Sequence, residues 1–405
     1  MNLRFISLFG LVLIVALGWV FSTNRKKFPL RVVFIGIGLQ VLFALLVLKT
    51  TPGLFIFQKV GDGVTHLLNY VDVGSRFVFG PNFQSVFFAF KVLPTIIFFS
   101  SLMSVLYHLG VMQMMVKWIA LIMQKTLKTS GAESLSASAN IFVGQTEAPL
   151  VIKPYLDSMT ISELHTVMVG GFATVAGGVL AAYVGMGVDA AHLITASVIS
   201  APAALVMGKI MLPETETPIT AGTKNFVIPK ETVNLFDAAT VGAADGVKLA
   251  INVGAMIIAF LALIALVDEG TQFLMGLMGL NLGLMDILSH VFAPFAWCMG
   301  IESKDILPVS QLLGIKMVSN EFIAYDKLGT WIKPGSGVEL SPRSIALTTY
   351  ALCGFANFGS IGIQLGGIGT LAPGRRADLA KIGFRAMIAG TLACFMTACV
   401  AGVIL

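Results

Sequence analysis

The sequence predicts an all-α polytopic membrane protein with eight transmembrane helices, two re-entrant hairpins, interfacial helices and an inverted-repeat core. Three observations predict this fold class. The chain is 56% hydrophobic and 12% charged, with a mean hydropathy of +0.89, whereas soluble domains carry about 25% charged residues. Apolar runs recur at the length of about 20 residues that a membrane-spanning helix needs. Two polar segments interrupt those runs in corresponding places of the two halves.

Eight apolar runs are long enough to be spans. They lie near residues 3–22, 30–49, 87–109, 164–187, 190–212, 248–268, 343–363 and 384–404. The run 270–300 fits neither a span nor a loop, and Pro213–Asp237 is the most polar loop. The chain shows no stretch that combines ordinary charge density with the length of a soluble domain.

Three further apolar segments are too polar or too broken to span. Residues 132–156 and 304–325 are polar-interrupted, which favours re-entrant hairpins whose irregular backbone is covered by protein. Residues 53–80 favour an amphipathic helix at the membrane interface. The ionisable residues of that helix are Asp62, His66, Asp72 and Arg76.

The distribution of basic residues predicts the orientation. The first apolar run precedes its strongest basic cluster and has no small-residue cleavage site, so we interpret it as a helix and not a signal peptide. With Arg25–Arg31 in the cytoplasm, alternation places the main basic clusters there too, as the positive-inside rule requires. Those clusters are Lys117–Lys128, Lys209–Lys230 and Arg375–Arg385, whereas Lys327, Lys333 and Arg343 fall outside. The short loops favour a bacterial inner membrane.

An internal repeat divides the chain. Asn140-Ile-Phe matches Asn320-Glu-Phe, and Gly171-Phe-Ala-Thr-Val-Ala-Gly matches Gly354-Phe-Ala-Asn-Phe-Gly-Ser, in the same order and at nearly the same offset. Paired interrupted segments of this kind are typical of the binding site of a secondary transporter. We therefore expect scaffold helices in 1–110, a first repeat in 111–246 and a second repeat in 247–405.

Polar residues at membrane depth are the candidates for substrate binding. Glu147 follows Gln145 and Thr146 in the first hairpin, and an intramembrane carboxylate is a functional candidate by default. The structural alternative is a helix start with Thr146 as N-cap. Glu321 occupies the second hairpin, where the alternative is a water-exposed hairpin end.

Asn357 and Ser360 lie three residues apart in the last interrupted span and so share one helix face. The alternative for this pair is helix–helix hydrogen bonding. An alkali cation needs several oxygen ligands, which unwound backbone exposes. The candidate ion ligands are Asn140, Val143, Thr174 and Val175.

Other functional classes find little support. No Walker A loop and no Gly-x-Ser-x-Gly motif is present. The histidines are scattered, and the four cysteines lie in apolar segments without zinc spacing, where we expect them to pack between helices. The net charge of +5 gives no indication of nucleic-acid binding. An integral-membrane enzyme acting on lipid-linked substrates would need an acidic loop motif that the chain lacks, and a passive channel stays open as an alternative.

The motifs Gly-Gln-Thr-Glu-Ala-Pro at 144–149, Asn-Glu-Phe at 320–322 and Gly-Phe-Ala-Asn at 354–357 resemble those of the concentrative nucleoside transporter family. Asn140 and Gly-Gly-Val at 177–179 fit as well. The resemblance covers most of the chain. It implies eight transmembrane helices, two opposed hairpins and three interfacial helices in each protomer of a homotrimer.

The resemblance also implies roles for single positions. Gln145, Thr146 and Glu147 would hydrogen-bond the nucleobase, and Glu321, Asn357 and Ser360 the ribose hydroxyls. Apolar contacts to the base would come from Phe355, Leu249 and Val179. Sodium would bind at Asn140, Val143, Thr174 and Val175. Gly359, beside Ser360, replaces a side chain that some relatives carry.

Together these features predict a secondary active symporter that imports nucleosides, such as uridine or adenosine, by alternating access driven by a sodium gradient. Proton coupling through Glu147 or Glu321 is the alternative, because either carboxylate is able to titrate. The sequence leaves the preference for purines or pyrimidines and the coupling stoichiometry open.

Overall fold

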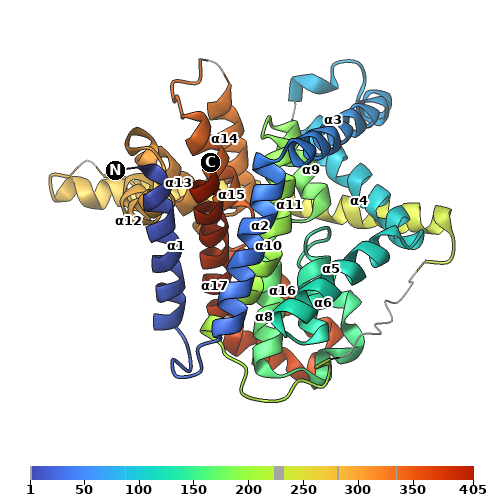
Figure 1. Cartoon of the computed structure of the whole chain (residues 1–405). Helices are drawn as coiled ribbons and strands as arrows, with labels where there is room; N and C mark the ends of the chain where they lie inside the picture. The colour runs from blue at the N-terminus through green and yellow to red at the C-terminus, as the bar shows by residue number, and fades with distance from the viewer. Residues whose placement is uncertain (1, 87, 223–231, 281, 334) are drawn as a thin grey trace.

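The computed structural model describes residues 2–86, 88–222, 232–280, 282–333 and 335–405, and every regular element in these ranges is a helix (Figure 1). Part of the basic cluster Lys209–Lys230, with Lys230 itself, lies outside the described residues. The elements divide into an N-terminal group, a central group around the first hairpin, and a C-terminal group around the second.

The N-terminal group begins with two upright helices, α1 and α2, that pack on either side of α17 (Figure 1). Its elements are α1 (Leu3–Val20), α2 (Leu30–Lys49), α3 (Thr51–Phe79), η1 (Phe83–Val86), η2 (Phe88–Val92), α4 (Leu93–His108) and α5 (Val111–Leu127). The predicted amphipathic segment 53–80 is the single helix α3, which starts at the N-cap Thr50 and ends at Gly80. It lies across the end of α2 (Figure 1).

The central group contains the first hairpin and the first interrupted span. Its elements are α6 (Gly131–Ala139), α7 (Ala148–Val151), η3 (Lys153–Ser158), α8 (Ile161–Ala173), α9 (Gly177–Gly185) and α10 (Ala190–Met211). The hairpin therefore runs slightly beyond the predicted 132–156. The span predicted at 164–187 is broken between α8 and α9, at the place where the Gly-Phe-Ala motif predicts an interruption.

The C-terminal group contains the second hairpin and the second interrupted span. Its elements are α11 (Leu235–Leu277), α12 (Leu284–Cys298), η4 (Ser303–Asp305), α13 (Ile306–Val318), α14 (Glu321–Ile332), α15 (Pro342–Leu352), α16 (Phe358–Leu371), η5 (Pro373–Arg375) and α17 (Arg376–Ile404). The second arm of this hairpin continues to Ile332, seven residues past the predicted end at 325. The two hairpins enter the molecule from opposite ends (Figure 1).

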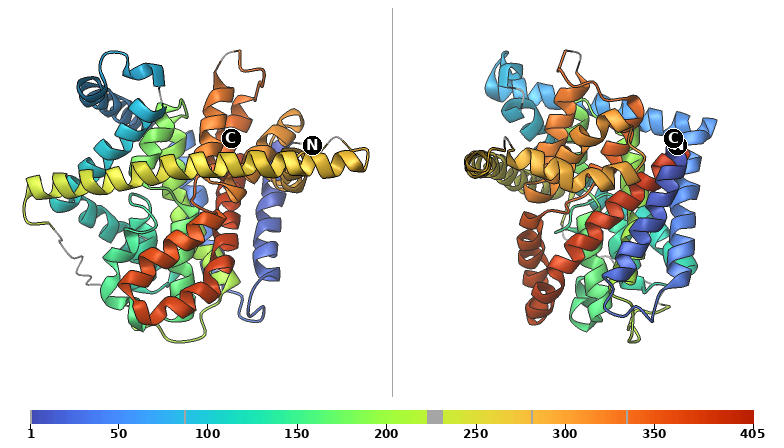
Figure 2. Two further views of the ribbon diagram at one scale, coloured as in Figure 1. Left: turned by 180° about the vertical axis from the view of Figure 1, so that it is seen from behind. Right: turned by 90° about the vertical axis from the view of Figure 1, so that its left-hand side faces the viewer.

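One predicted span has different bounds. The run 248–268 is the middle of α11, which has 43 residues and lies crosswise to α1 and α17 (Figure 2). The predicted run is shorter than the helix because it covers only the most apolar stretch, whereas α11 also contains Asp237 and Asp245 before that stretch and Glu269 after it. In a helix that lies across the others, charged residues in the middle of the helix are able to point to the protein surface.

Seven of the eight predicted runs correspond to helical stretches long and apolar enough to span a membrane, within the described residues. The eighth, 343–363, is divided between α15 and α16 by a break at 353–357, as its motif predicts. The unassigned stretch 270–300 contains α12.

The interior of the fold is built from α17, the α8–α9 pair and α10. In their most apolar windows 89%, 83% and 78% of the residues are buried, against 11% for α11. Small residues allow this close packing: a Cβ added to Gly390 on α17 would lie 2.3 Å from the Cβ of Phe172 on α8. All four cysteines are free and buried, as expected. The polar interruptions therefore lie in the best-packed part of the molecule.

Candidate functional site

The polar tip of the first hairpin is a series of turns between α6 and α7. α6 begins with a capping box in which the Ser130 side chain accepts from the Glu133 backbone N–H and the Glu133 carboxylate accepts from the Ser130 N–H. Residues 140–147 then form turns before α7. The N-cap of α7 is Glu147 and not Thr146, and no side-chain capping bond forms. The alternative interpretation of Thr146 as a cap is therefore wrong.

Asn140 holds a buried oxygen atom with no donor. Its side chain is 1% exposed, and its Nδ2 donates to the Ser136 carbonyl at 3.1 Å. Its Oδ1 has no hydrogen-bond partner. An unsatisfied buried acceptor costs about 1–3 kcal/mol, and a bound cation would relieve that cost. This atom fits the predicted ion site.

The other predicted ion ligands lie on the two segments that meet beside Asn140. Thr174 and Val175 follow the end of α8 and are buried. The Gly177 N–H donates to the Phe142 carbonyl at 3.0 Å, which ties the hairpin tip to the start of α9. Val143 lies next to that contact and lines a cavity. Unwound backbone and the orphan amide oxygen thus come from the two elements that the sequence predicted.

The second hairpin places a buried carboxylate at its tip. Asn320 caps α14, whose first residue is Glu321. The Glu321 side chain accepts hydrogen bonds from the Tyr183 hydroxyl at 3.0 Å and from Asn357 Nδ2 at 3.2 Å. It is 4% exposed, so the alternative of a water-exposed hairpin end is wrong. Asn357 in turn caps α16 by accepting from the Ser360 N–H at 2.8 Å.

A second network joins the two halves. Gln145 Nε2 in the first hairpin donates to Ser360 Oγ at 3.2 Å on α16. Gln364 Nε2 donates both to Gln145 Oε1 at 3.0 Å and to the Met168 carbonyl at 3.1 Å. Thr146 lies against α16 at Gly367. Asn357 and Ser360 therefore act in networks with both hairpins and are not simple helix–helix contacts.

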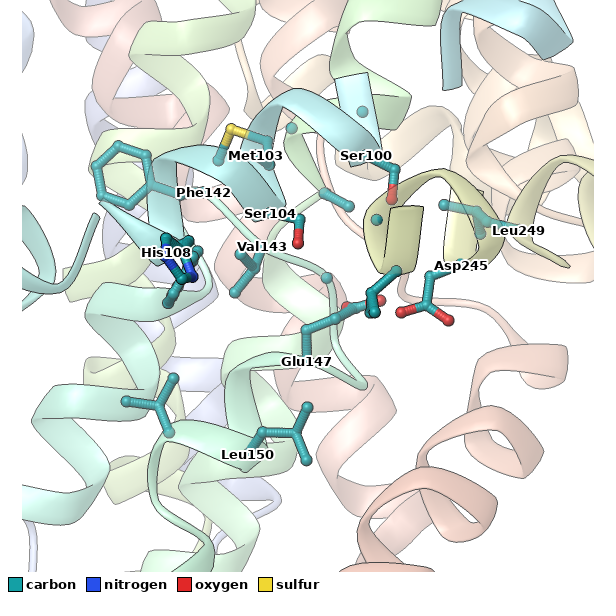
Figure 3. A pocket seen from close by; sticks show the side chains of 18 of the residues that line it. Ser100, Met103, Ser104, His108, Phe142, Val143, Glu147, Leu150, Asp245 and Leu249 are labelled. Atoms are coloured by element: carbon teal, nitrogen blue, oxygen red, sulfur yellow. The ribbon is translucent and has the colours of Figure 1, made fainter. Parts of the chain in front are cut away.

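A cavity of about 340 Å³ opens on the other side of the first hairpin tip. It lies between the tip, α4, the start of α5, the start of α9 and α11. Glu147 and Leu249 line it, and Glu147 and Asp245 face the same part of it from the hairpin and from α11 (Figure 3). The polar atoms Tyr107 OH and Gln113 Oε1 are buried there without partners.

The predicted substrate residues therefore fall into two connected groups. Glu147 and Leu249 line the cavity, whereas Gln145, Glu321, Asn357 and Ser360 form the buried network. Val179 is 2% exposed on α9. Phe355 is half-buried in the second break, and its N–H donates to the Thr174 carbonyl at 3.2 Å.

Two residues of the network were missed by the sequence analysis. Tyr183 is buried on α9 and holds Glu321. Gln364 is fully buried, one turn beyond Ser360. The spacing of Gln364, four residues after Ser360, places both on one face of α16 and was the signal available for it. Nothing in the sequence near Tyr183 distinguishes it from a packed aromatic residue.

The base of the first hairpin carries a buried ion cluster. Lys209 Nζ lies 2.7 Å from Glu133 and 3.2 Å from Glu214, and the Lys209 and Glu133 side chains are 4% and 1% exposed. The Glu214 carboxyl lies in the loop after α10. Partial burial acts to raise its pKa, but the Lys209 charge and hydrogen bonds outweigh burial, and the pKa lies below its usual value. The cluster fastens α6 to α10.

Three family models together match nearly the whole chain. Residues 192–402 match "Na+ dependent nucleoside transporter C-terminus", and residues 9–82 match "Na+ dependent nucleoside transporter N-terminus". Residues 89–190, which contain the first hairpin and the first interrupted span, match a model described as "Nucleoside recognition".

Individual relatives are similar over nearly the whole chain. "Solute carrier family 28 member 3" of Eptatretus stoutii is 47% identical over 98% of this chain, which spans 60% of that relative. "Sodium/nucleoside cotransporter 1" of Rattus norvegicus is 44% identical over 99% of this chain and 64% of its own length. A bacterial relative from Haemophilus influenzae, called an uncharacterized transporter, is 44% identical over 98% of this chain and 96% of its own length. The chain thus spans about 60% of the length of the animal relatives.

Solved structures of CNTnw have the same fold. CNTnw in an inward-facing substrate-bound state has a TM-score of 0.92 at 42% identity, with 99% of this chain and 97% of that chain covered. A variant of CNTnw in an outward-facing state has a TM-score of 0.94 at the same identity, with 99% and 98% covered.

Proposed function

Because this chain belongs to the Na⁺-dependent nucleoside transporter family, we propose that it imports nucleosides, such as uridine or adenosine, by sodium symport. The observation that carries the proposal is the meeting of both hairpin tips with both interrupted spans. Gln145 of the first hairpin bonds Ser360, and Glu321 of the second bonds Asn357. A site assembled in this way changes shape when either half moves.

The chemistry of the network suits a nucleoside. Gln145, Thr146 and Glu147 offer donors and acceptors to the edge of the base, with Val179, Leu249 and Phe355 as apolar contacts. Glu321, Asn357 and Ser360 offer acceptors and donors to the sugar diol. A hydroxyl that donates to a carboxylate makes a bond roughly twice as strong as a neutral one. We therefore expect the ribose hydroxyls to contribute to affinity.

Sodium is the proposed coupling ion, held by Asn140, Val143, Thr174 and Val175. The orphan Oδ1 of Asn140 supplies a side-chain ligand, and the break after α8 supplies backbone carbonyls. The ion would tie the hairpin tip to the break beside Gln145. Because coupling is reciprocal, sodium then raises nucleoside affinity by the factor by which the nucleoside raises sodium affinity.

Alternating access follows from the two hairpins entering from opposite ends. The hairpins and interrupted spans would move as a unit past α4 and α11. We also propose a homotrimer, as the family resemblance implies. The outer face of α11 exposes Ile251, Ile258 and Leu266 by 64%, 74% and 65% in the single chain, where lipid or another protomer would cover them. The protein is an integral membrane protein, and the bacterial relative supports placing it in the inner membrane of a bacterium.

Proton coupling is the second candidate. Glu321 is buried, and within the described residues no cationic group lies within the 4.0 Å of an ion pair from its carboxylate. A carboxylate whose side-chain hydrogen bonds come from neutral donors, as those of Glu321 do, is able to take up a proton during transport. The enzyme alternative finds no support, because the matched family consists of transporters.

Uptake of labelled uridine into proteoliposomes tests the proposal. We expect accumulation above equilibrium with an inward sodium gradient and none when potassium replaces sodium at the same pH. Accumulation driven by a proton gradient and indifferent to sodium would assign coupling to the carboxylates. Equilibration without accumulation would indicate a passive channel. No uptake of uridine or adenosine by folded protein would refute a nucleoside transporter.

A further inference from the structure

The second hairpin contains a buried lysine that the proposed function does not use. Lys316 lies on α13, one turn before the hairpin tip, and its side chain is 2% exposed. Its Nζ donates to the Ala351 carbonyl at 2.9 Å. Within the described residues its ammonium group forms no ion pair. Its charge acts on the Glu321 carboxylate at longer range than an ion pair. A buried cation without a close partner is costly, so this position calls for an explanation beyond packing.

The acceptor of Lys316 lies at the edge of the second break. Ala351 belongs to the last turn of α15, which ends at Leu352. The last carbonyls of a helix have no intrahelical partner and carry partial negative charge, so a cation is favourable there. The break that follows leads to Asn357, which caps α16 and donates to Glu321. Lys316 thus bonds the C-terminal end of α15. The break that starts there leads to Asn357 and Ser360, which are proposed to bind the ribose.

The internal repeat gives this lysine a counterpart in the first half. Position 316 precedes Asn320 by four residues, as Ser136 precedes Asn140. In the first half Asn140 Oδ1 has no donor, and this is the atom that the proposed sodium ion would satisfy. In the second half Asn320 Oδ1 accepts from the Ile323 N–H at 2.9 Å. The first hairpin tip therefore leaves the Asn140 Oδ1 acceptor open. The second tip has no such open acceptor on Asn320, and the Lys316 ammonium group lies one turn before it.

We propose that the Lys316 ammonium is a fixed cation that holds the second break in its binding shape, as the sodium ion is proposed to hold the first. The inference rests on the proposed function, because it makes Lys316 a positioning residue for nucleoside binding. It places one exchangeable cation in the first half and one tethered cation in the second. Lys316 acts through Ala351 and the 353–357 break, and through its charge on the Glu321 carboxylate, without touching the nucleoside.

Ligand-induced thermal stabilisation of the purified full chain in detergent tests the proposal. Sodium chloride alone reports the ion site, and uridine titrated at saturating sodium reports the nucleoside site. Three variants are compared with the wild type: Lys316→Met, Lys316→Gln and Lys327→Met. Methionine keeps the packing volume without charge. Glutamine keeps a hydrogen-bond donor without charge.

Lys327 is the matched control, because it lies on the other arm of the same hairpin and donates to Gln311 at 3.1 Å. We expect Lys327→Met to leave both titrations unchanged. We expect Lys316→Met and Lys316→Gln to keep stabilisation by sodium and to raise the uridine dissociation constant about tenfold or more, the loss expected for a hydrogen bond from a charged group.

Wild-type uridine affinity in Lys316→Met would overturn the proposal. Recovery of that affinity in Lys316→Gln would also overturn it, because a neutral hydrogen bond would then suffice. Failure of both variants to fold would assign Lys316 to folding and not to the break. If the wild type itself is not stabilised by uridine, the proposed function fails instead, so the two failures are distinguishable.

Discussion

Replacing Glu321 with glutamine tests the proposed ribose site at the group that the structure holds most tightly. The carboxylate accepts from Tyr183 and from Asn357 at 3.0 and 3.2 Å and is 4% exposed. Glutamine is nearly the same size but offers one acceptor oxygen and an NH₂ group. One of the two protein donors then faces another donor, and the charge that would receive a ribose hydroxyl is gone.

The expected loss follows from those contacts. A hydrogen bond to a charged group contributes about 1.5–3 kcal/mol. Removing the charge from the ribose acceptor should therefore raise the uridine dissociation constant about 10- to 150-fold. The displaced donor adds a cost to the unliganded protein, because an unpaired buried polar group costs about 1–3 kcal/mol. We expect the Glu321→Gln protein to melt at a lower temperature than the wild type.

The assay is isothermal titration at saturating sodium with uridine, 2′-deoxyuridine and 3′-deoxyuridine. In the wild type at least one deoxy analogue should bind about tenfold or more weakly than uridine. In Glu321→Gln that preference should shrink to within about threefold, because the acceptor that read the hydroxyl is missing. Tyr183→Phe, which removes a donor and keeps the carboxylate, should retain most of the preference. An unchanged preference in Glu321→Gln would refute the assignment of Glu321 to the sugar.

Three further predictions concern the ion site and the base of the first hairpin. Asn140→Ala should remove stabilisation by sodium chloride and weaken sodium-dependent uridine binding. A sodium response equal to that of the wild type would show that Asn140 is not part of the ion site. Lys209→Met should leave Glu133 buried without its cation and lower the free energy of unfolding by about 3–5 kcal/mol. The measurement is the melting temperature in detergent, which should fall. A melting temperature at or above that of the wild type would show that the cluster does not stabilise the fold. Because the pKa of Glu214 lies below its usual value, its contribution to stability is present above the unfolded-state pKa of about 4.3 and is lost as the pH falls through the lower folded-state pKa. Glu214→Gln should therefore lower the melting temperature at pH 7, and the difference from the wild type should narrow on acidification below about pH 4; a difference independent of pH would contradict the ionic explanation.

Much of the architecture was accessible from the sequence because apolar length and interruption are local properties. The break after α8 and the break before α16 lie within the predicted spans, and both hairpin tips carry the predicted polar residues. The bounds of α11 were not accessible. Charged residues normally mark the end of a span, but a helix that lies crosswise carries Asp245 and Asp268 in its interior.

The site was predicted less completely than the fold. Gln145, Glu321, Asn357 and Ser360 are brought together, but the partners that fix them come from elsewhere in the chain. Tyr183 reaches Glu321 across 138 positions, and Gln364 reaches Gln145 across 219. No local pattern encodes contacts at such separations, since they depend on how the two halves pack. The burial of Lys316 is likewise not visible in the sequence, because its acceptor, the Ala351 carbonyl, lies 35 positions away.

The contact between the two breaks also constrains how the protein is made. The Phe355 N–H donates to the Thr174 carbonyl, and Cys394 Sγ lies 3.2 Å from the Cys353 carbonyl and 3.8 Å from the Ala173 carbonyl. A backbone group left unpaired in lipid costs several kcal/mol. Ribosomes deliver the first half long before the second, so the nascent first half holds its interruption at Thr174 incomplete until Phe355 has been inserted. The two halves are therefore partners in biogenesis, and the first half expressed alone lacks the residues that close its own break.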